Sequence, residues 1–207
     1  MLSAESCSSE GEMRIILASK SPRRIEILEN LGLSPEIIPA DVDESTDGFP
    51  DQPEKAVMLL AERKARAASA AVSDGSALVI AADTLVYLDK ELLGKPKDKA
   101  DAKKMLMRLS GKSHSVYTGI CAMLGEKCES SAVETKVFFK ELSESEIEWY
   151  VNDGEPIDKA GAYGIQGKGS LFVEKICGDY FNVVGLPVSE LFSMIEEKIG
   201  ISFEELG

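Results

Sequence analysis

The chain has 207 residues, 44% of them hydrophobic, which is enough for one sizeable globular domain or for a domain with a small added lobe. Its formal net charge of -13 argues against nucleic-acid binding, because such a surface needs a basic footprint to release counterions. No apolar run approaches the roughly 18 residues of a membrane span. We therefore expect a cytoplasmic protein that contacts neither nucleic acid nor membrane.

Residues 1–12 are rich in Ser and Glu and contain no hydrophobic segment, so we expect a disordered tail before a single domain over residues 13–207. The chain has four cysteines without CxxC spacing and a single histidine, which disfavours a metal site built from these residues. Cys121 and Cys128 could form a bridge across a hairpin, but reduced thiols are the expectation.

The domain opens with a strand, a polar turn and a helix. Residues 14–18 form a short apolar run typical of a buried strand. Residues 22–31 have helical periodicity, and Gly32 ends the helix. The apolar face of this helix comprises Ile25, Leu28 and Leu31.

The polar turn between these elements is the first candidate binding site. Ser21 suits the position before a helix and Pro22 suits its first position. Arg23 and Arg24 then fall in the first helical turn, where cations are unfavourable because the N-terminus carries partial positive charge and free N–H groups. An anion bound at the turn resolves this conflict. The alternative is that both arginines point into solvent, and the local sequence leaves both interpretations open.

The next segments alternate strands, loops and helices. Residues 35–39 are expected to form a short strand, followed by an acidic loop at residues 41–44. Residues 53–72 form an Ala-rich helix with Lys64 near its centre. Residues 77–82 are the most hydrophobic run of the chain and predict a strand buried on both faces.

The second half of the chain predicts further strands and helices in no strict strand–helix–strand order. The expected strands are residues 85–88, 91–93, 114–124, 128–141, 171–176 and 180–184, and the expected helices are residues 99–109, 144–151 and 187–199. Gly125 and Glu126 separate the two longest strands as a hairpin turn, and residues 160–169 form a Gly-rich loop. This order indicates an α/β fold with a mixed sheet and helices packed on it.

Asp83 is the strongest candidate for a general base. It directly follows the most hydrophobic run, and open α/β sheets bind their ligands at the carboxyl ends of strands. The alternative is a strand terminator that faces water. Asp43 and Glu44 could join Asp83 around a divalent cation, because Mg²⁺ takes few protein carboxylates and completes its coordination with phosphates and water. Composition alone favours a solvated acidic loop at these positions.

Two lysines and one loop are candidate phosphate ligands. Lys64 and Lys95 could each bind phosphate, although a lone lysine is usually a surface residue; Gly94 and Pro96 form a tight turn around Lys95. The Gly-rich loop does not have the GxGxxG spacing of a dinucleotide site, and Gly111-Lys112-Ser113 lacks the upstream Gly of a P-loop. His114 shows no sequence relation to a Ser nucleophile, so we do not expect a hydrolytic triad.

Five motifs in order resemble the Maf family of nucleoside triphosphate pyrophosphatases. They are LASKSPRR (17–24), AADT (81–84), GKP (94–96), LSGKSH (109–114) and DKAGAYGIQG (158–167). The resemblance spans residues 14–199. It implies a single elongated α/β domain similar to the inosine triphosphate pyrophosphatase fold, with a cleft between two lobes. It also implies a homodimer that hydrolyses a nucleoside triphosphate to the monophosphate and pyrophosphate.

The resemblance also implies roles for individual residues. Asp83 matches the catalytic carboxylate, which would bind Mg²⁺ or Mn²⁺ together with Glu44. Lys64 and Lys95 match positions that handle metal and phosphate. The positions that match the dTTP and UTP branch are Arg23, Thr84 and Gln166, and we expect Ser19, Ser21 and Arg24 to bind substrate beside them.

A different class of function is the alternative. The chain could bind nucleoside triphosphates without turnover and act as a regulator of cell division. Pyrophosphate release distinguishes the two hypotheses.

Overall fold

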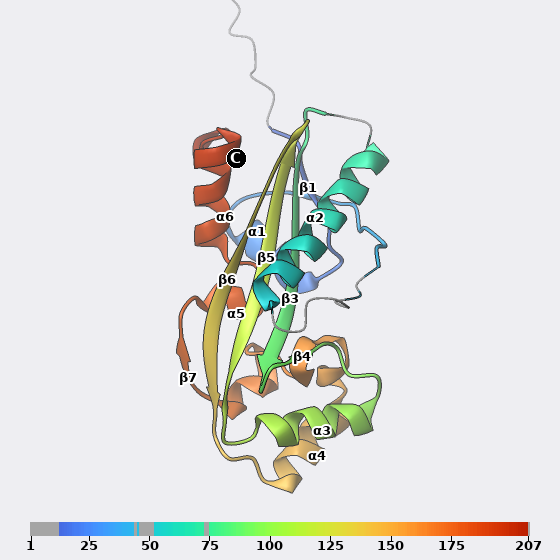
Figure 1. Cartoon of the computed structure of the whole chain (residues 1–207), viewed down its shortest axis with the longest axis vertical. Coiled ribbons are helices and arrows are strands. Elements are labelled where there is room, and N and C mark those ends of the chain that lie inside the picture. The colour runs from blue at the N-terminus through green and yellow to red at the C-terminus, as the bar shows by residue number, and fades with distance from the viewer. Residues whose placement is uncertain (1–12, 44, 46–51, 73–74, 207) are drawn as a thin grey trace, which may run out of the picture.

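The computed structural model describes residues 13–43, 45, 52–72 and 75–206, so the expectation of a disordered tail over residues 1–12 lies outside the described residues. A seven-stranded mixed sheet forms the centre of the molecule, in the order β2-β1-β3-β5-β6-β7, with β4 paired to β3 (Figure 1). The strands are β1 (Ile15–Leu17), β2 (Glu36–Ile37), β3 (Leu78–Leu88), β4 (Glu91–Leu93), β5 (Ser113–Leu124), β6 (Lys127–Phe139) and β7 (Val173–Cys177). The expected α/β class with a mixed sheet is confirmed.

The position of Asp83 in β3 differs from the predicted one. The sequence predicted a strand that ends before Asp83 and another that begins after Thr84, but β3 is one strand that runs through both residues. It is continuous because β5 pairs with it from Leu78 to Tyr87, so Asp83 lies within the ladder, opposite Gly119. Asp83 is therefore not at the carboxyl end of its own strand.

The other edge of β3 is open beside Asp83. β1 runs parallel to β3 and pairs with residues 78–80, and β4 runs antiparallel and pairs with residues 86–88. Within the described residues, no strand pairs with this edge at residues 81–85. Site residues can therefore reach Asp83 through the gap beyond the end of β1. The site thus lies at the carboxyl end of β1, in the place where open α/β sheets bind their ligands, although Asp83 itself is in the middle of β3.

Helices cover both faces of the sheet and enclose one end of it. α2 (Pro53–Val72) packs on one face, where Ala61 and Ala65 contact the sheet. α1 (Pro22–Asn30) and α6 (Val188–Met194) cover the opposite face, and α6 continues as a π-helical segment at Ile195–Ile199. α3 (Lys99–Leu109) and α4 (Glu144–Asp153) lie together at the lower end of Figure 1.

The molecule is elongated and has two lobes joined by the long strands β3, β5 and β6 (Figure 1). One hydrophobic cluster lies between the upper sheet and helices α1 and α6. A separate cluster, centred on Leu106, Phe139 and Tyr150, forms the interior of the lower lobe. The expected elongated single domain with two lobes is what the structure contains.

Two local predictions were wrong. Residues 180–184 are the short helix α5 (Tyr180–Val184), not a strand, because Asp179 caps the segment by accepting a hydrogen bond from the Phe181 N–H. In the apolar face predicted for α1, Leu28 is buried as predicted and Ile25 is partly buried against the core, but Leu31 is 38% exposed. The buried residues of α1 are Arg24, Ile27 and Leu28. These residues have the i, i+3, i+4 spacing of one helix face, and the face turns inward because the Arg24 guanidinium bonds to buried oxygens.

The described cysteines, Cys121, Cys128 and Cys177, are free thiols. The sulfur atoms of Cys121 and Cys128 lie 3.6 Å apart and share a thiol hydrogen bond, not a disulfide. No helix in the described part of the chain is both long enough and apolar enough to cross a membrane.

Candidate active site

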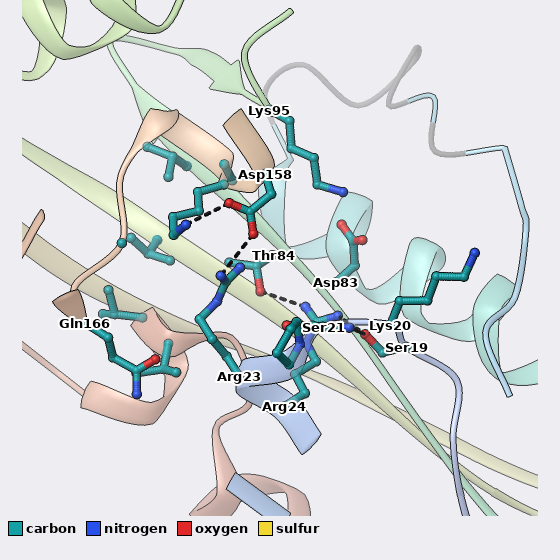
Figure 2. Close-up of a pocket in the computed structure, with 18 of the residues that line it drawn as sticks. Ser19, Lys20, Ser21, Arg23, Arg24, Asp83, Thr84, Lys95, Asp158 and Gln166 are labelled. Atoms are coloured by element: carbon teal, nitrogen blue, oxygen red, sulfur yellow. Dashed lines mark hydrogen bonds and ion pairs between the residues drawn. The ribbon is translucent and has the colours of Figure 1, made fainter. Parts of the chain in front are cut away.

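A cavity of about 500 Å³ lies between the two lobes, at the open edge of β3 (Figure 2). Its walls come from the turn after β1, the middle of β3, the segment after β4 and the Gly-rich loop. The predicted site residues that line it are Ser19, Ser21, Arg23, Arg24, Lys64, Asp83, Thr84, Lys95 and Gln166. Glu44, predicted as a metal and catalytic residue, lies outside the described residues. The fold thus brings together distant segments that the sequence selected separately.

Asp83 and Lys64 form an ion pair at the base of the cavity. The Lys64 Nζ donates to Asp83 Oδ1, and the two residues are 7% and 9% exposed. Asp83 projects from β3 toward α2, and Lys64 reaches it from the middle of that helix. α2 comes this close because β5 has a glycine opposite Asp83: a Cβ at Gly119 would lie 2.3 Å from the Val57 carbonyl.

Arg24 is buried and bonds to several parts of the site. Its Nε donates to the Gly185 carbonyl at 2.8 Å, Nη1 to Ser19 Oγ at 3.0 Å and Nη2 to Thr84 Oγ1 at 3.1 Å. Ser19 Oγ also accepts from the Ser21 N–H at 3.2 Å. Ser21 occupies the position before α1 as predicted, but its side chain makes no capping hydrogen bond. Of the two interpretations that the sequence left open, the one in which both arginines point into solvent is therefore wrong for Arg24: this guanidinium holds the turn, β3 and α5 together.

Arg23 faces the cavity and contacts the opposite lobe. Its Nη1 lies 3.3 Å from Asp158 Oδ2, and Lys159 Nζ donates to Asp158 Oδ1 at 2.7 Å (Figure 2). Burial acts to raise the pKa of Asp158, but the hydrogen bond and charge of Lys159 and the charge of Arg23 outweigh burial and leave this pKa below its ordinary value. The ion pair links the polar turn, across the cavity, to the segment that directly precedes the Gly-rich loop.

His114 supports the wall of the cavity from below. Its Nε2 lies 2.7 Å from the hydroxyl of Tyr163, a lining residue, and its ring packs edge-on against Phe139. Burial lowers the pKa of His114 to about 4. His114 therefore packs behind Tyr163 and supports this wall of the cavity.

Some lining residues were not singled out from the sequence. Lys20, Asp158 and Lys159 lie within the quoted motifs and line the cavity. The sequence signal that could have identified these three residues is their charge, at positions close to Arg23 or to the Gly-rich loop. Thr118 and Asn182, which are buried behind the cavity, had no signal in the sequence because only the folded sheet brings them near Thr84.

The described residues contain no cluster of three or more possible metal ligands. Asp83 provides one carboxylate at the base of the cavity, and cationic side chains line much of the remainder. This donor set fits Mg²⁺ or Mn²⁺ only as a partner of bound phosphate, because such ions commonly take one or two protein carboxylates and complete their coordination with substrate oxygens and water. The described residues fit a metal shared with substrate and do not form a protein cage.

Fold and cavity together define an α/β protein with a cation-lined cavity between two lobes. Lys20, Arg23, Lys95 and Lys159 line the cavity around a single buried carboxylate–ammonium pair, although the whole chain carries a net charge of -13. Figure 2 shows the Lys95 side chain extending over the cavity from the lower lobe, with Lys20 and Arg23 approaching from the polar turn. A concentration of positive charge in an acidic protein favours a phosphorylated ligand.

Comparison with known proteins identifies the family. Residues 14–198 match the family described as Maf-like protein. The chain is 49% identical over 195 residues to the dTTP/UTP pyrophosphatase of Caldanaerobacter subterraneus subsp. tengcongensis, covering 93% of each chain. It is 50% identical over 184 residues to the dTTP/UTP pyrophosphatase of Bacillus anthracis, covering 89% of this chain and 95% of the relative. The chain belongs to the Maf family.

A solved structure of a HAM1 protein from Coxiella burnetii is also similar, with a TM-score of 0.44 and 16% identity over 61% of this chain and 73% of that chain. Because the TM-score is below 0.5, this likeness adds nothing to the fold described above.

Proposed function

We propose that this protein hydrolyses nucleoside triphosphates, with dTTP and UTP as preferred substrates, to the nucleoside monophosphate and pyrophosphate. The close relatives that carry the name dTTP/UTP pyrophosphatase support this activity. The observation that carries the proposal is the cavity itself. One buried carboxylate, Asp83, lies among cationic side chains that come from both lobes.

The charge of the triphosphate is offset by side chains around the cavity. Arg23 and Lys20 approach from the polar turn, and Lys95 approaches from the lower lobe. The Arg23 guanidinium is held by its ion pair with Asp158 before substrate arrives, and together the three cations offset the charge that develops on the leaving pyrophosphate. Ser19 and Ser21 line the same wall and offer polar contacts to the phosphates.

Asp83 orients the attacking water and accepts its proton. A carboxylate in this position acts as a general base when water lies within hydrogen-bonding distance of it. Lys64 holds the carboxylate in place through the ion pair at the base of the cavity. The reaction needs no covalent intermediate, because water attacks the phosphate directly.

A divalent cation, Mg²⁺ or Mn²⁺, is part of this proposal, with Asp83 and Glu44 as its protein ligands. When bound, it supplies positive charge to the phosphate oxygens of the substrate. The part of the chain that the structure describes provides Asp83 for this role.

The base of the nucleotide lies between Arg23, Thr84 and Gln166 in this proposal. The Gln166 amide offers both a donor and an acceptor, which matches a pyrimidine edge that presents both. The family resemblance further predicts a homodimer, and the acidic composition predicts that the protein binds no nucleic acid.

Substituting Asp83→Asn tests the proposal. Asn has nearly the same volume and still offers Lys64 an acceptor, but it takes up no proton. We expect pyrophosphate release from UTP with Mg²⁺ to fall by about 10²- to 10⁴-fold, the usual contribution of a general base. Binding of uridine monophosphate, measured by calorimetry, should persist.

Asp89→Asn is the matched control. Asp89 is an exposed carboxylate in the turn after β3, with its Oδ2 3.0 Å from Lys112, and should leave turnover unchanged. If Asp83→Asn retained full turnover, Asp83 would not be the base. If the unmodified protein bound triphosphates but released no pyrophosphate from any of them, the alternative hypothesis of a regulator that binds nucleotides without turnover would be correct.

A further inference from the structure

A buried chain of hydrogen bonds runs from α5 to the cavity through two threonines. Thr118 on β5 lies directly opposite Thr84 on β3, and their hydroxyl oxygens are 2.9 Å apart. Thr118 Oγ1 is also 2.9 Å from the main-chain carbonyl oxygen of Asn182. Thr118 and Asn182 are fully buried, whereas Thr84 lines the cavity.

The direction of each hydrogen bond in this chain follows from the chemistry of the groups. A carbonyl oxygen only accepts, so Thr118 must donate its single hydroxyl hydrogen to Asn182. The bond between the threonines then uses the hydrogen of Thr84, with Thr118 as acceptor. Each hydroxyl has one hydrogen, so both bonds form together only in this arrangement.

Arg24 occupies one lone pair of the Thr84 hydroxyl oxygen. Its Nη2 donates to Thr84 Oγ1 at 3.1 Å (Figure 2). A hydroxyl oxygen has two lone pairs, so the contacts to Thr118 and Arg24 leave Thr84 with a single lone pair and no hydrogen for a ligand. Within the described residues, the Thr84 hydroxyl can therefore only accept a hydrogen bond from a molecule in the cavity.

Asn182 is itself rigidly held, which makes the arrangement stable. Its Nδ2 donates to the Val116 carbonyl and to Thr135 Oγ1, both at 3.0 Å. Thr135 Oγ1 in turn donates to the Asp179 carbonyl at 2.9 Å. These contacts dock α5 on the sheet and place the Asn182 carbonyl beside Thr118.

We propose that Thr118 is a positioning residue for base selection. Thr118 directs the hydroxyl hydrogen of Thr84 away from the cavity. The Thr84 oxygen then accepts a hydrogen bond from N3–H of uracil or thymine and disfavours cytosine. Uracil and thymine carry a hydrogen on N3, whereas N3 of cytosine is an acceptor and would face the lone pair of Thr84. The inference rests on the proposed function, in which Thr84 faces the base.

The test compares UTP with CTP in variants of Thr118. Thr118→Val keeps the β-branched shape but removes the hydroxyl, which frees the Thr84 hydrogen to turn toward the cavity. We expect the ratio of kcat/KM for UTP to that for CTP to fall by about 3- to 10-fold, the factor that one net hydrogen bond represents. Thr118→Ser retains the hydroxyl and should restore the ratio. Thr118→Ala provides the same test if the valine variant folds poorly.

Thr135→Val is the matched control, because it also removes one buried hydroxyl that contacts Asn182 but does not touch Thr84. It should lower thermal stability and leave the UTP to CTP ratio unchanged. An equal loss of selectivity in Thr135→Val would show that docking of α5 matters and not the direction of the Thr84 hydrogen. An unchanged ratio in both Thr118→Val and Thr118→Ala would also overturn the inference.

Calorimetry separates failure of this inference from failure of the proposed function. Uridine and cytidine 5′-monophosphates are titrated into the unmodified protein and into Thr118→Val. If no triphosphate is turned over but uridine monophosphate binds more tightly and Thr118→Val removes the difference, the inference holds without the hydrolase activity. If both monophosphates bind equally to the unmodified protein, the inference is wrong.

Discussion

Arg24 illustrates at the scale of one residue how a charged side chain becomes part of the interior. Its guanidinium is planar and presents donors in several fixed directions, which matches oxygens on the polar turn, β3 and α5. Those oxygens belong to Gly185, Ser19 and Thr84, and each is partly or wholly shielded from water. The neighbouring Arg23 instead has a quarter-exposed side chain that faces the cavity. Two adjacent arginines in the sequence thus have different roles.

Substituting Arg24→Lys should therefore destabilise the protein, because an ammonium on a flexible stem cannot reach all of these acceptors and leaves buried oxygens unsatisfied. We expect the free energy of unfolding to fall by about 1 to 3 kcal/mol. Urea denaturation monitored by circular dichroism measures the change.

Arg23→Lys is the control for that substitution. The Arg23 ion pair with Asp158 is partly exposed, with side chains 26% and 60% exposed, so stability should change by less than about 1 kcal/mol. Equal losses of stability in the two variants would contradict the structural role assigned to Arg24.

At the scale of elements, the contact between α2 and the sheet positions Lys64 against Asp83. α2 packs on β5 with its backbone close to Gly119, and Gly119 lies opposite Asp83 in the ladder. The absence of a side chain at this position lets the helix approach. The ion pair between Lys64 and Asp83 therefore depends on a glycine that takes no part in it.

Gly119→Ala should separate α2 from the sheet. The new Cβ would lie 2.3 Å from backbone atoms of Val57 and 2.6 Å from the Met58 nitrogen, and backbone cannot yield as a flexible side chain can. We expect a loss of about 1 to 3 kcal/mol in stability, as for overpacked cores, together with reduced turnover of UTP. Thermal unfolding and pyrophosphate release measure the two effects.

Gly75→Ala is the matched control. A Cβ there would meet nothing nearer than the Gly125 Cα at 3.9 Å, so neither stability nor turnover should change appreciably. A Gly119→Ala protein with native stability would show that α2 can move away from β5 without cost.

At the scale of the whole molecule, three long strands join the hydrophobic interiors of the upper and lower lobes, and the cavity lies between the lobes. The lower cluster contains the aromatic contacts of His114 with Phe139 and Tyr163. Because Tyr163 also lines the cavity, the packing of the lower lobe determines the shape of one wall of the site. Stability of this lobe and integrity of the site are therefore coupled.

His114 should make the stability of the protein depend on pH. Burial lowers its pKa from 6.5 to about 4, so between these values the unfolded chain takes up a proton that the folded chain does not. The free energy of unfolding therefore has its full value, as far as His114 is concerned, above about pH 6.5. As the pH falls toward 4, protonation of His114 in the unfolded chain lowers this free energy by up to about 3 kcal/mol. Urea denaturation at a series of pH values measures the slope.

His114→Gln provides the comparison, since it keeps a polar partner for Tyr163 but does not titrate. Its unfolding free energy should change less between pH 6.5 and pH 4.5 than that of the unmodified protein, and the carboxylates contribute equally to both. Parallel pH profiles for the two proteins would refute the assignment.

The sequence by itself determined the elements whose signals are local. The bounds of α2 are those predicted, and the capping box of Ser143 with Glu146 begins α4, because helix periodicity and capping chemistry need only neighbouring residues. The hairpin of β5 and β6 follows in the same way, and the order of the elements along the chain indicated the mixed sheet. The sequence also identified the residues that the cavity brings together, through motifs that lie far apart in the chain.

Only the tertiary structure decided what depends on partners from distant segments. Asp83 lies within β3 because β5 pairs along the whole strand, and residues 180–184 are helical although their composition suits a strand. Arg24 is buried because Gly185 and Thr84 supply acceptors that no local pattern reveals. Thr118 directs the hydroxyl of Thr84 only once β3, β5 and α5 are assembled. Local periodicity determines elements, whereas hydrogen-bond direction and burial arise from long-range packing.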